Sequence, residues 1–203
     1  MSSLGKNKFS TDLEKWLTSK GTKTLGQLEG VFAEKSFAIA IFLLMAIPAL
    51  PIPTGGVSHV LEILTLIIAG QIFVGRNSIW IPKKWKSLSV NGKNQKIGLV
   101  GLLKFIRFFE RFSRPRWSNL IKSNLGRLSF ATMVSIFTLF AFFAPPFSGL
   151  DTLPALGVVV LCLSVILEDV FLSILGFLIG TGGVVLVFIL GKAAYEGVKH
   201  LFS

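Results

Sequence analysis

The sequence predicts an all-α polytopic membrane protein, and three observations support this class. Hydrophobic residues make up 52% of the 203 residues and charged residues only 15%, against about 25% charged in an average soluble domain. The net charge is +11, yet the basic residues lie between the apolar segments and not within them. This pattern is typical of a membrane protein with positive cytoplasmic loops, and it disfavours a soluble enzyme or a nucleic-acid binder.

The charges divide the chain into four regions. Residues 76–127 carry thirteen Lys and Arg against one acid, whereas the long apolar stretches on either side contain no Lys or Arg. We predict N-terminal interfacial helices over 1–35, a first membrane repeat over 36–75, a basic linker over 76–127, and a second membrane repeat with a C-terminal helix over 128–203. The regions 1–35 and 76–127 are expected on the cytoplasmic side. The side of the C-terminus stays open.

The elements follow in order along the chain. Ser10 or Thr11 is expected to cap a short N-terminal helix, and a second short helix is expected over 24–28. Five apolar helices are predicted next, over 36–47, 57–75, 128–144, 154–167 and 170–190. The first and fourth measure roughly 18 and 21 Å at 1.5 Å per residue. Both are short for a hydrocarbon core of roughly 30 Å.

Each half contains a Pro/Gly-rich turn beside one of the short helices. The turn residues are Pro51, Pro53, Gly56, Pro146, Gly149 and Pro154. Interrupted apolar segments at corresponding positions of two halves are typical of transporters with inverted repeats and a site near the midplane. We therefore predict two degenerate, inverted repeats with broken or re-entrant helices. Ordinary loops between ordinary helices are the open alternative.

The basic linker contains an amphipathic pattern over 97–112. Its apolar face is expected in the headgroup boundary and its cations toward anionic lipid phosphates. The apolar face comprises Leu99, Leu102, Leu103, Ile106 and Phe109, and the basic face Lys104, Arg107 and Arg111. Lipid or phosphate contact is also expected from Arg76, Arg114 and Arg116. Simple anchoring is favoured over recognition of one headgroup.

Ionisable side chains within membrane segments are functional candidates, because they are costly unless paired or hydrated. His59 and Glu62 lie three residues apart on one helical face, where a histidine beside a carboxylate can relay a proton near neutral pH. An interfacial ion pair is the alternative. The predicted polar path also includes Ser58, Gln71, Asp151 and Asp169, although Asp169 could instead be an N-cap.

Enzyme motifs are missing from the sequence. It contains no HExxH, GxSxG, CxxC or Walker motif, so we expect no catalytic residue, cofactor or metal. Cys162 lies in an apolar run and is interpreted as a buried filler. The glycines between Gly180 and Gly183 are interpreted as a helix-packing surface rather than a phosphate loop.

The order of several short motifs resembles the ExoD family of bacterial membrane proteins, labelled exopolysaccharide synthesis. The motifs run from Leu25 to Leu28, then Pro48, Pro51-Ile-Pro53 and Gly56, Ala69-Gly-Gln71, Gly75-Arg76, Trp80-Ile-Pro82, Arg114-Pro-Arg116-Trp117, Pro146-Phe147, Leu153-Pro154-Ala155-Leu156 and Glu168-Asp169. Glu168 and Val170 depart from the Arg and Gly that the family has around its Asp. The resemblance implies a role tied to exopolysaccharide production and supplies no established reaction.

Together these features predict a small transporter or channel of the bacterial inner membrane, with broken helices meeting at a polar midplane site. The expected partners are a bilayer with anionic lipids, a second copy of the chain, and exopolysaccharide synthesis machinery, but no nucleic acid. The alternative is a non-transporting accessory protein that docks a synthase or its lipid-linked substrate through the basic linker. In that case neutralising Lys83, Lys84 and Lys86 abolishes its role, while changes at His59 and Glu62 do not.

Overall fold

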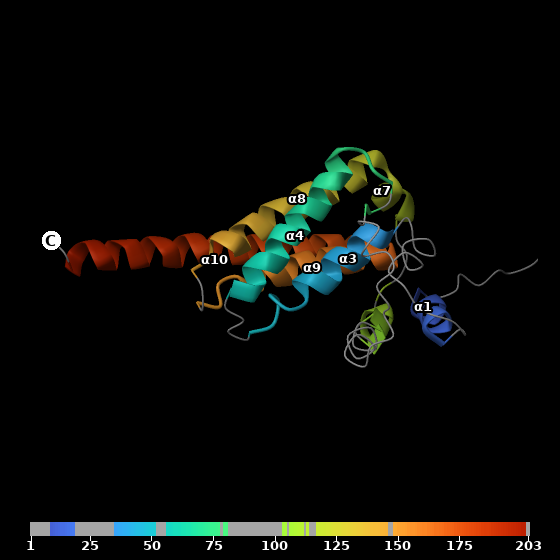
Figure 1. Ribbon diagram of the computed structural model, residues 1–203, viewed down its shortest axis with the longest axis horizontal. Coiled ribbons are helices and arrows are strands. Elements are labelled where there is room, and N and C mark those ends of the chain that lie inside the picture. The colour runs from blue at the N-terminus through green and yellow to red at the C-terminus, as the bar shows by residue number, and fades with distance from the viewer. Residues whose placement is uncertain are drawn as a thin grey trace, which may run out of the picture.

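The computed structural model describes residues 9–18, 35–51, 56–77, 79–80, 103–104, 106–111, 113, 117–145 and 148–201. Every regular element in these ranges is a helix. In chain order the elements are α1 (Phe9–Thr18), α3 (Ser36–Met45), α4 (Gly56–Phe73), α7 (Ser118–Lys122), α8 (Asn124–Phe143), α9 (Thr152–Leu167) and α10 (Val170–Leu201). Figure 1 shows α3, α4, α8 and α9 side by side, with α10 extending past them toward the C-terminus.

The five predicted apolar helices are confirmed, with shifts of up to four residues at most of their ends, while the last helix runs eleven residues past its predicted end at 190, to Leu201. The helix α8 begins four residues before the predicted start, and Ser123 caps it by accepting a 3.0 Å hydrogen bond from the Gly126 amide. Within the described ranges, three helices are long and apolar enough to cross a membrane, namely Gly56–Phe73, Asn124–Phe143 and Val170–Lys192. The two shorter apolar helices are α3 and α9, the same two that the sequence predicts to be short.

The helices form two antiparallel hairpins, α3–α4 and α8–α9, which pack on each other. The Lys35 ammonium before α3 donates to the Ile166 carbonyl near the end of α9 (2.7 Å), so α3 runs antiparallel to α9. The α4–α8 pair is also antiparallel, because His59 contacts Phe142 at one end and Arg127 bonds to Asn77 at the other. Both Pro/Gly turns therefore lie at the same end of the helical body.

The helix α9 forms the centre of the protein, and glycines bring α10 against it. Cys162 is fully buried, as predicted for a filler residue. A Cβ atom added to Gly157 would lie 2.5 Å from the Gly180 Cα, and one added to Gly183 would lie 2.5 Å from Pro154. The predicted packing role of Gly180 and Gly183 is therefore confirmed.

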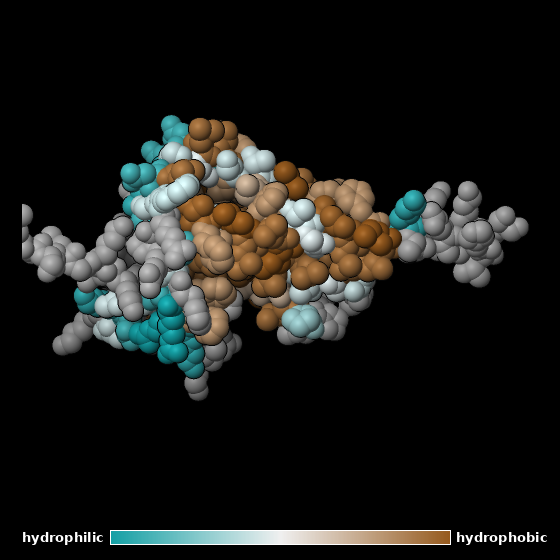
Figure 2. All heavy atoms as spheres, turned by 180° about the vertical axis from the view of Figure 1, so that it is seen from behind, coloured by the Kyte–Doolittle hydropathy of each residue, from teal (hydrophilic) through white to brown (hydrophobic). Residues whose placement is uncertain are grey.

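The middle of the molecule has an apolar surface. Large apolar side chains of α4, α8 and α10 are exposed, among them Val60, Ile67, Leu139, Leu178 and Phe188. Figure 2 shows a broad apolar belt over the middle of the molecule, with hydrophilic residues at the end where α1 lies. Lys192 of α10 is exposed toward the other end. An apolar belt between two polar ends is the surface expected where lipid replaces water.

Two expectations for the polar regions are corrected. The helix α1 begins at Phe9, so Ser10 lies inside it and bonds to the Glu110 carboxylate through both its amide and its hydroxyl. Leu103 and Ile106 are buried in the hydrophobic core, so protein and not the lipid headgroup region covers this part of the predicted amphipathic face. A hydrophobic partner within the protein explains the difference, since burial there removes the same apolar area from water.

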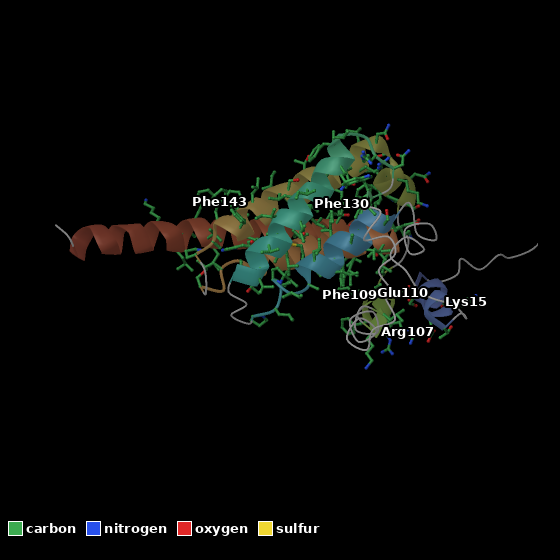
Figure 3. All side chains as sticks on the ribbon, in the orientation of Figure 1. Lys15, Arg107, Phe109, Glu110, Phe130 and Phe143 are labelled. Atoms are coloured by element: carbon green, nitrogen blue, oxygen red, sulfur yellow. The ribbon has the colours of Figure 1, made fainter. Side chains whose placement is uncertain are left out.

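The basic face of the same segment is exposed, as predicted. Lys104, Arg107 and Arg111 are exposed, and Arg107 pairs with Glu14 of α1. Figure 3 shows Arg107, Phe109 and Glu110 on the short helical segment beside α1. The expected helix over 24–28 and the residues 97–102 lie outside the described residues.

Candidate functional site

The helices α4 and α8 pack along each other, and the buried faces of both carry small and polar side chains, called here the α4–α8 seam. The buried residues of α4 recur every three or four positions and include Ser58, Glu62, Thr65 and Ala69. The buried residues of α8 recur with the same spacing and include Ala131, Val134, Thr138 and Ala141. Small residues let two helices approach closely. Because several of these small residues are polar, the buried faces of α4 and α8 form a polar strip in place of a purely apolar core.

The carboxylate of Glu62 is the most unusual group in this seam. Its side chain is 0% exposed, and it lies in α4, one of the three candidate membrane spans, where a charged group is costly. Its Oε2 atom lies 3.0 Å from Nδ1 of His59, whose side chain is 28% exposed. The His59 ring lies 5.2 Å, between centroids, from the ring of Phe142. The histidine therefore links the accessible edge of the helix pair to a buried acid.

Three buried oxygen atoms of the seam have no hydrogen-bond partner within the described part of the chain. They are Glu62 Oε1, Thr65 Oγ1 and Thr138 Oγ1. Buried polar atoms are almost always paired, so three unpaired atoms in one seam are a feature that folding alone does not explain. Asp151, at the start of α9, lies close enough for its charge to act on Glu62. The seam can thus hold a proton or a small cation between acids and hydroxyls.

The remaining residues of the predicted polar path lie at the other end of the helical body. Gln71 Oε1 accepts a hydrogen bond from the Trp80 amide (2.6 Å). Asp169 caps α10 by accepting from the Phe171 amide (3.0 Å), and its second oxygen accepts from the Ser113 hydroxyl (2.9 Å). The structure therefore brings Ser58, His59, Glu62 and Asp151 to one end, while Gln71 and Asp169 hold loops and helix starts at the opposite end.

The predicted turn residues contribute in different ways. Gly56 is the first residue of α4, Pro51 is exposed, and Pro154 is buried against Gly183. Gly149 has a φ of +69°, a left-handed conformation that favours glycine. Pro53 and Pro146 lie outside the described residues.

Of the three arginines Arg76, Arg114 and Arg116 predicted to contact lipid, Arg76 alone lies in the described part of the chain. Arg76 is exposed, and its carbonyl accepts a hydrogen bond from Arg127 (2.6 Å). Arg114 and Arg116 lie outside the described ranges. The linker contact with lipid phosphates stays a prediction.

A second polar cluster, which sequence reasoning missed, surrounds Glu168 at the end of α9. Glu168 has a left-handed backbone (φ +56°), and its Oε1 lies 3.1 Å from the Nζ atoms of both Lys35 and Lys122. Its Oε2 accepts from the Ser118 hydroxyl (2.7 Å). The sequence did contain a clue to this cluster. Lys35 and Lys122 each lie just before an apolar segment, and the predicted topology places the starts of both segments on the same side of the membrane.

The environment of Glu168 changes its acidity. Burial disfavours the charged form of Glu168 and by itself would raise its pKa. This effect is outweighed by the hydrogen bonds from Ser118 and Lys35, by the charge of Lys35 and by the hydrogen bond from Lys122. Together they lower the pKa of Glu168 from 4.5 to about 2. The fold therefore favours the carboxylate. The resulting stabilisation is fully present above about pH 4.5 and is lost as the pH falls toward 2.

Acidification is accordingly expected to destabilise the protein through this residue. The loss is on the order of 2–3 kcal/mol between about pH 5 and about pH 2, given about 1.4 kcal/mol for each pH unit of pKa change. The thermal unfolding midpoint of the purified protein in detergent, followed against pH, measures it. In Glu168→Gln the acid-dependent part should be absent. The matched control Glu14→Gln, which changes an exposed acid, should keep the wild-type slope, and an equal loss of slope in both variants contradicts the assignment.

The fold and the buried polar seam define a helical integral membrane protein. Three candidate spans, an apolar surface belt and an acid enclosed between two helices belong to this class. The chain is a member of the ExoD family, because the family described as "Exopolysaccharide synthesis, ExoD" matches residues 9–189. The resemblance read from the short motifs is thereby confirmed, and with it a link to exopolysaccharide synthesis.

The comparison with curated proteins adds one relative and no mechanism. The chain is 30% identical over 138 residues to an uncharacterized protein of Synechocystis sp. (strain ATCC 27184 / PCC 6803 / Kazusa). The alignment covers 68% of this chain and 64% of that relative, so the chain spans a little under two thirds of the relative's length. No solved structure matches the chain.

Proposed function

We propose that the protein is a small proton-coupled transporter or channel of the bacterial inner membrane, with the α4–α8 seam as its polar path. The observation that carries the proposal is the Glu62 carboxylate, fully buried in a candidate membrane span and held by His59. An ionisable group at such a position is costly unless it has a partner or water. An imidazole can both accept and donate a proton, so a partly exposed histidine hydrogen-bonded to a buried acid is suited to take a proton at the accessible edge and pass it inward.

The unpaired oxygens support movement of a proton or small cation along the seam. Thr65 lies one helical turn beyond Glu62 on the buried face of α4, and Thr138 lies on the facing helix. Their hydroxyls and Glu62 Oε1 all lack partners within the described ranges. A transient water chain or a bound cation would satisfy all three atoms, whereas a purely structural seam would leave them unsatisfied.

The position of the hairpin turns supports re-entrant or broken helices. Pro154 packs against Gly183 of α10, and apolar residues of α10 continue past this level to Leu190. Figure 1 shows α10 extending well beyond both turns. If α10 crosses the bilayer, the Pro/Gly turns and the adjacent His59 end of the seam lie below the membrane surface. Non-helical backbone at that depth is typical of a cavity or ion path.

The wider assignment follows from the charge pattern and from the size of the chain. We place the N-terminus and the linker 76–127 in the cytoplasm because they carry the basic residues. The start of α10 lies beside this linker, so the C-terminal end of α10 then faces outward. The protein acts in exopolysaccharide synthesis as a non-enzymatic component, with a second copy completing the enclosure of the path. Support for a second copy comes from the large exposed apolar area on so few helices.

Proton uptake into proteoliposomes tests the proposed function. Purified protein is reconstituted with a pH-sensitive dye inside and a potassium diffusion potential as the driving force. We expect wild-type vesicles to acidify at least about tenfold faster than empty vesicles, and Glu62→Gln and His59→Ala to fall to the empty-vesicle rate, because each removes a proton-binding group.

The control for this assay is Glu14→Gln, which changes an exposed acid of α1 and should keep the wild-type rate. Uptake by wild type that equals that of empty vesicles overturns the proposal. The accessory-protein alternative predicts a different pattern: loss of exopolysaccharide in cells on neutralising Lys83, Lys84 and Lys86, and no effect of Glu62→Gln.

A further inference from the structure

A cationic cavity opens at the end of the helical body opposite to the Pro/Gly turns. This cavity, called here the headgroup pocket, has a volume of about 330 Å³, within the usual range for small-molecule sites. Its polar lining comprises Lys35, Asn77, Lys122, Arg127 and Glu168. Three cations face a single carboxylate, so the pocket carries a net positive charge and favours an anionic ligand.

The polar side chains of the headgroup pocket are held in place by the protein. Glu168 Oε1 lies 3.1 Å from both Lys35 and Lys122, whose side chains are 22% and 49% exposed. Arg127 donates to Asn77 Oδ1 (2.8 Å) and to the Arg76 carbonyl (2.6 Å). A guanidinium carries five N–H donors, so these two bonds orient Arg127 and leave further donors for a ligand. Oriented arginine and lysine groups are typical of phosphate sites.

An apolar groove lies directly beside this pocket. It has a volume of about 180 Å³ and is lined mainly by apolar residues of α7, α8, α9 and α10. Ile121 and Val165 line both the headgroup pocket and the groove, so the two share a wall. A ligand that fills both must combine an anionic group with a hydrocarbon chain.

The pocket also lies where lipid phosphates are found. Asn77 follows the candidate span Gly56–Phe73, Arg127 lies in the first turn of Asn124–Phe143, and Glu168 precedes Val170–Lys192. The ends of the spans coincide with the boundary between hydrocarbon and headgroups, and cationic pockets at this boundary attract anionic lipids.

We propose that the headgroup pocket binds the phosphate of a lipid whose hydrocarbon chain occupies the adjacent apolar groove. Lys122 and Arg127 contact the phosphate, and Glu168 keeps the two lysines in place when the site is empty. The proposal is independent of proton transport, because its residues lie at the opposite end of α4 and α8 from Glu62. Lipid binding can therefore be lost while proton uptake is retained, and proton uptake can be lost while lipid binding is retained.

Calorimetric titration of the purified protein in detergent tests the proposal with three probes: dioctanoyl phosphatidate, inorganic phosphate and dioctanoyl phosphatidylcholine. We expect saturable binding of phosphatidate, at least about tenfold tighter than that of the other two probes, because only phosphatidate supplies both an exposed anionic phosphate and a chain. Equal affinity for inorganic phosphate would identify a free-phosphate site and overturn the lipid assignment. Absence of saturable phosphatidate binding overturns the site itself.

Three variants separate the contributions of the two cavities. Lys122→Gln should weaken phosphatidate binding by at least about tenfold. Ser129→Phe, which fills the apolar groove from its exposed rim, should weaken phosphatidate binding but leave the affinity for inorganic phosphate unchanged. The matched control Lys104→Gln removes an exposed cation that does not line the pocket and should change neither. Equal weakening by Lys104→Gln and Lys122→Gln would show general attraction to basic protein and overturn the proposal.

Discussion

Replacing Gly157 by alanine is expected to lower the free energy of unfolding by roughly 2–4 kcal/mol. A Cβ atom at this position would lie 2.5 Å from the Cα of Gly180 and 3.0 Å from the carbonyl oxygen of Gly176. These are backbone atoms of α10, and they cannot turn away as the end of a flexible side chain can. The α9–α10 contact must therefore open, and α9 is the most enclosed of the described helices, with twelve buried residues.

The matched control is Gly182→Ala in α10. Gly182 is exposed, and an added Cβ atom there meets nothing within 4 Å. Because alanine is favoured over glycine inside a helix by up to about 1 kcal/mol, this variant should be neutral or slightly stabilised. The thermal unfolding midpoints of the two purified variants in the same detergent provide the comparison. Similar destabilisation by both substitutions would show that helix propensity or detergent, and not close packing, sets the effect.

The fold follows closely from sequence patterns because the membrane restricts the alternatives. Apolar runs bounded by prolines, glycines and charges mark helices, and every backbone group at membrane depth must find an internal partner. The helix α9 shows how little freedom remains: Pro154 lies in its first turn and Glu168 ends it, close to the predicted limits of 154 and 167. Sequence patterns of this kind cannot establish the predicted repeats or their inverted relation. Those depend on the superposition of the two halves in three dimensions and not on the pattern of any single segment.

The candidate sites could be predicted only where their residues are local in sequence. His59 and Glu62 are three residues apart on one helix, so helical geometry alone places them together. The cluster at Glu168 joins residues from three regions of the chain, and Lys35 and Lys122 meet there only through tertiary packing. Gln71 shows the opposite error: it shares a helix with Glu62, but its partner is the Trp80 amide after the helix ends.

Glu62→Leu is expected to stabilise the protein while it abolishes proton uptake. The wild-type carboxylate is fully buried, has one unpaired oxygen, and relies on a single described hydrogen-bond partner, His59. Replacing a buried ionic group by an apolar side chain of similar volume commonly raises stability by about 1–4 kcal/mol. We expect a higher thermal midpoint for this variant, together with uptake at the rate of empty vesicles.

The comparison of Glu62→Leu with Glu168→Leu separates a functional acid from a structural one. Glu168 satisfies Lys35, Lys122 and Ser118, and its removal leaves two neighbouring ammonium groups without their shared partner. Truncating such a network is destabilising, typically by about 3 kcal/mol or more, so Glu168→Leu should lower the midpoint. A polar seam that is retained for function lowers the stability of the fold. A polar network that is retained for the fold raises its stability. If Glu62→Leu also lowers the midpoint, the His59–Glu62 pair belongs to the fold and its role in transport is lost.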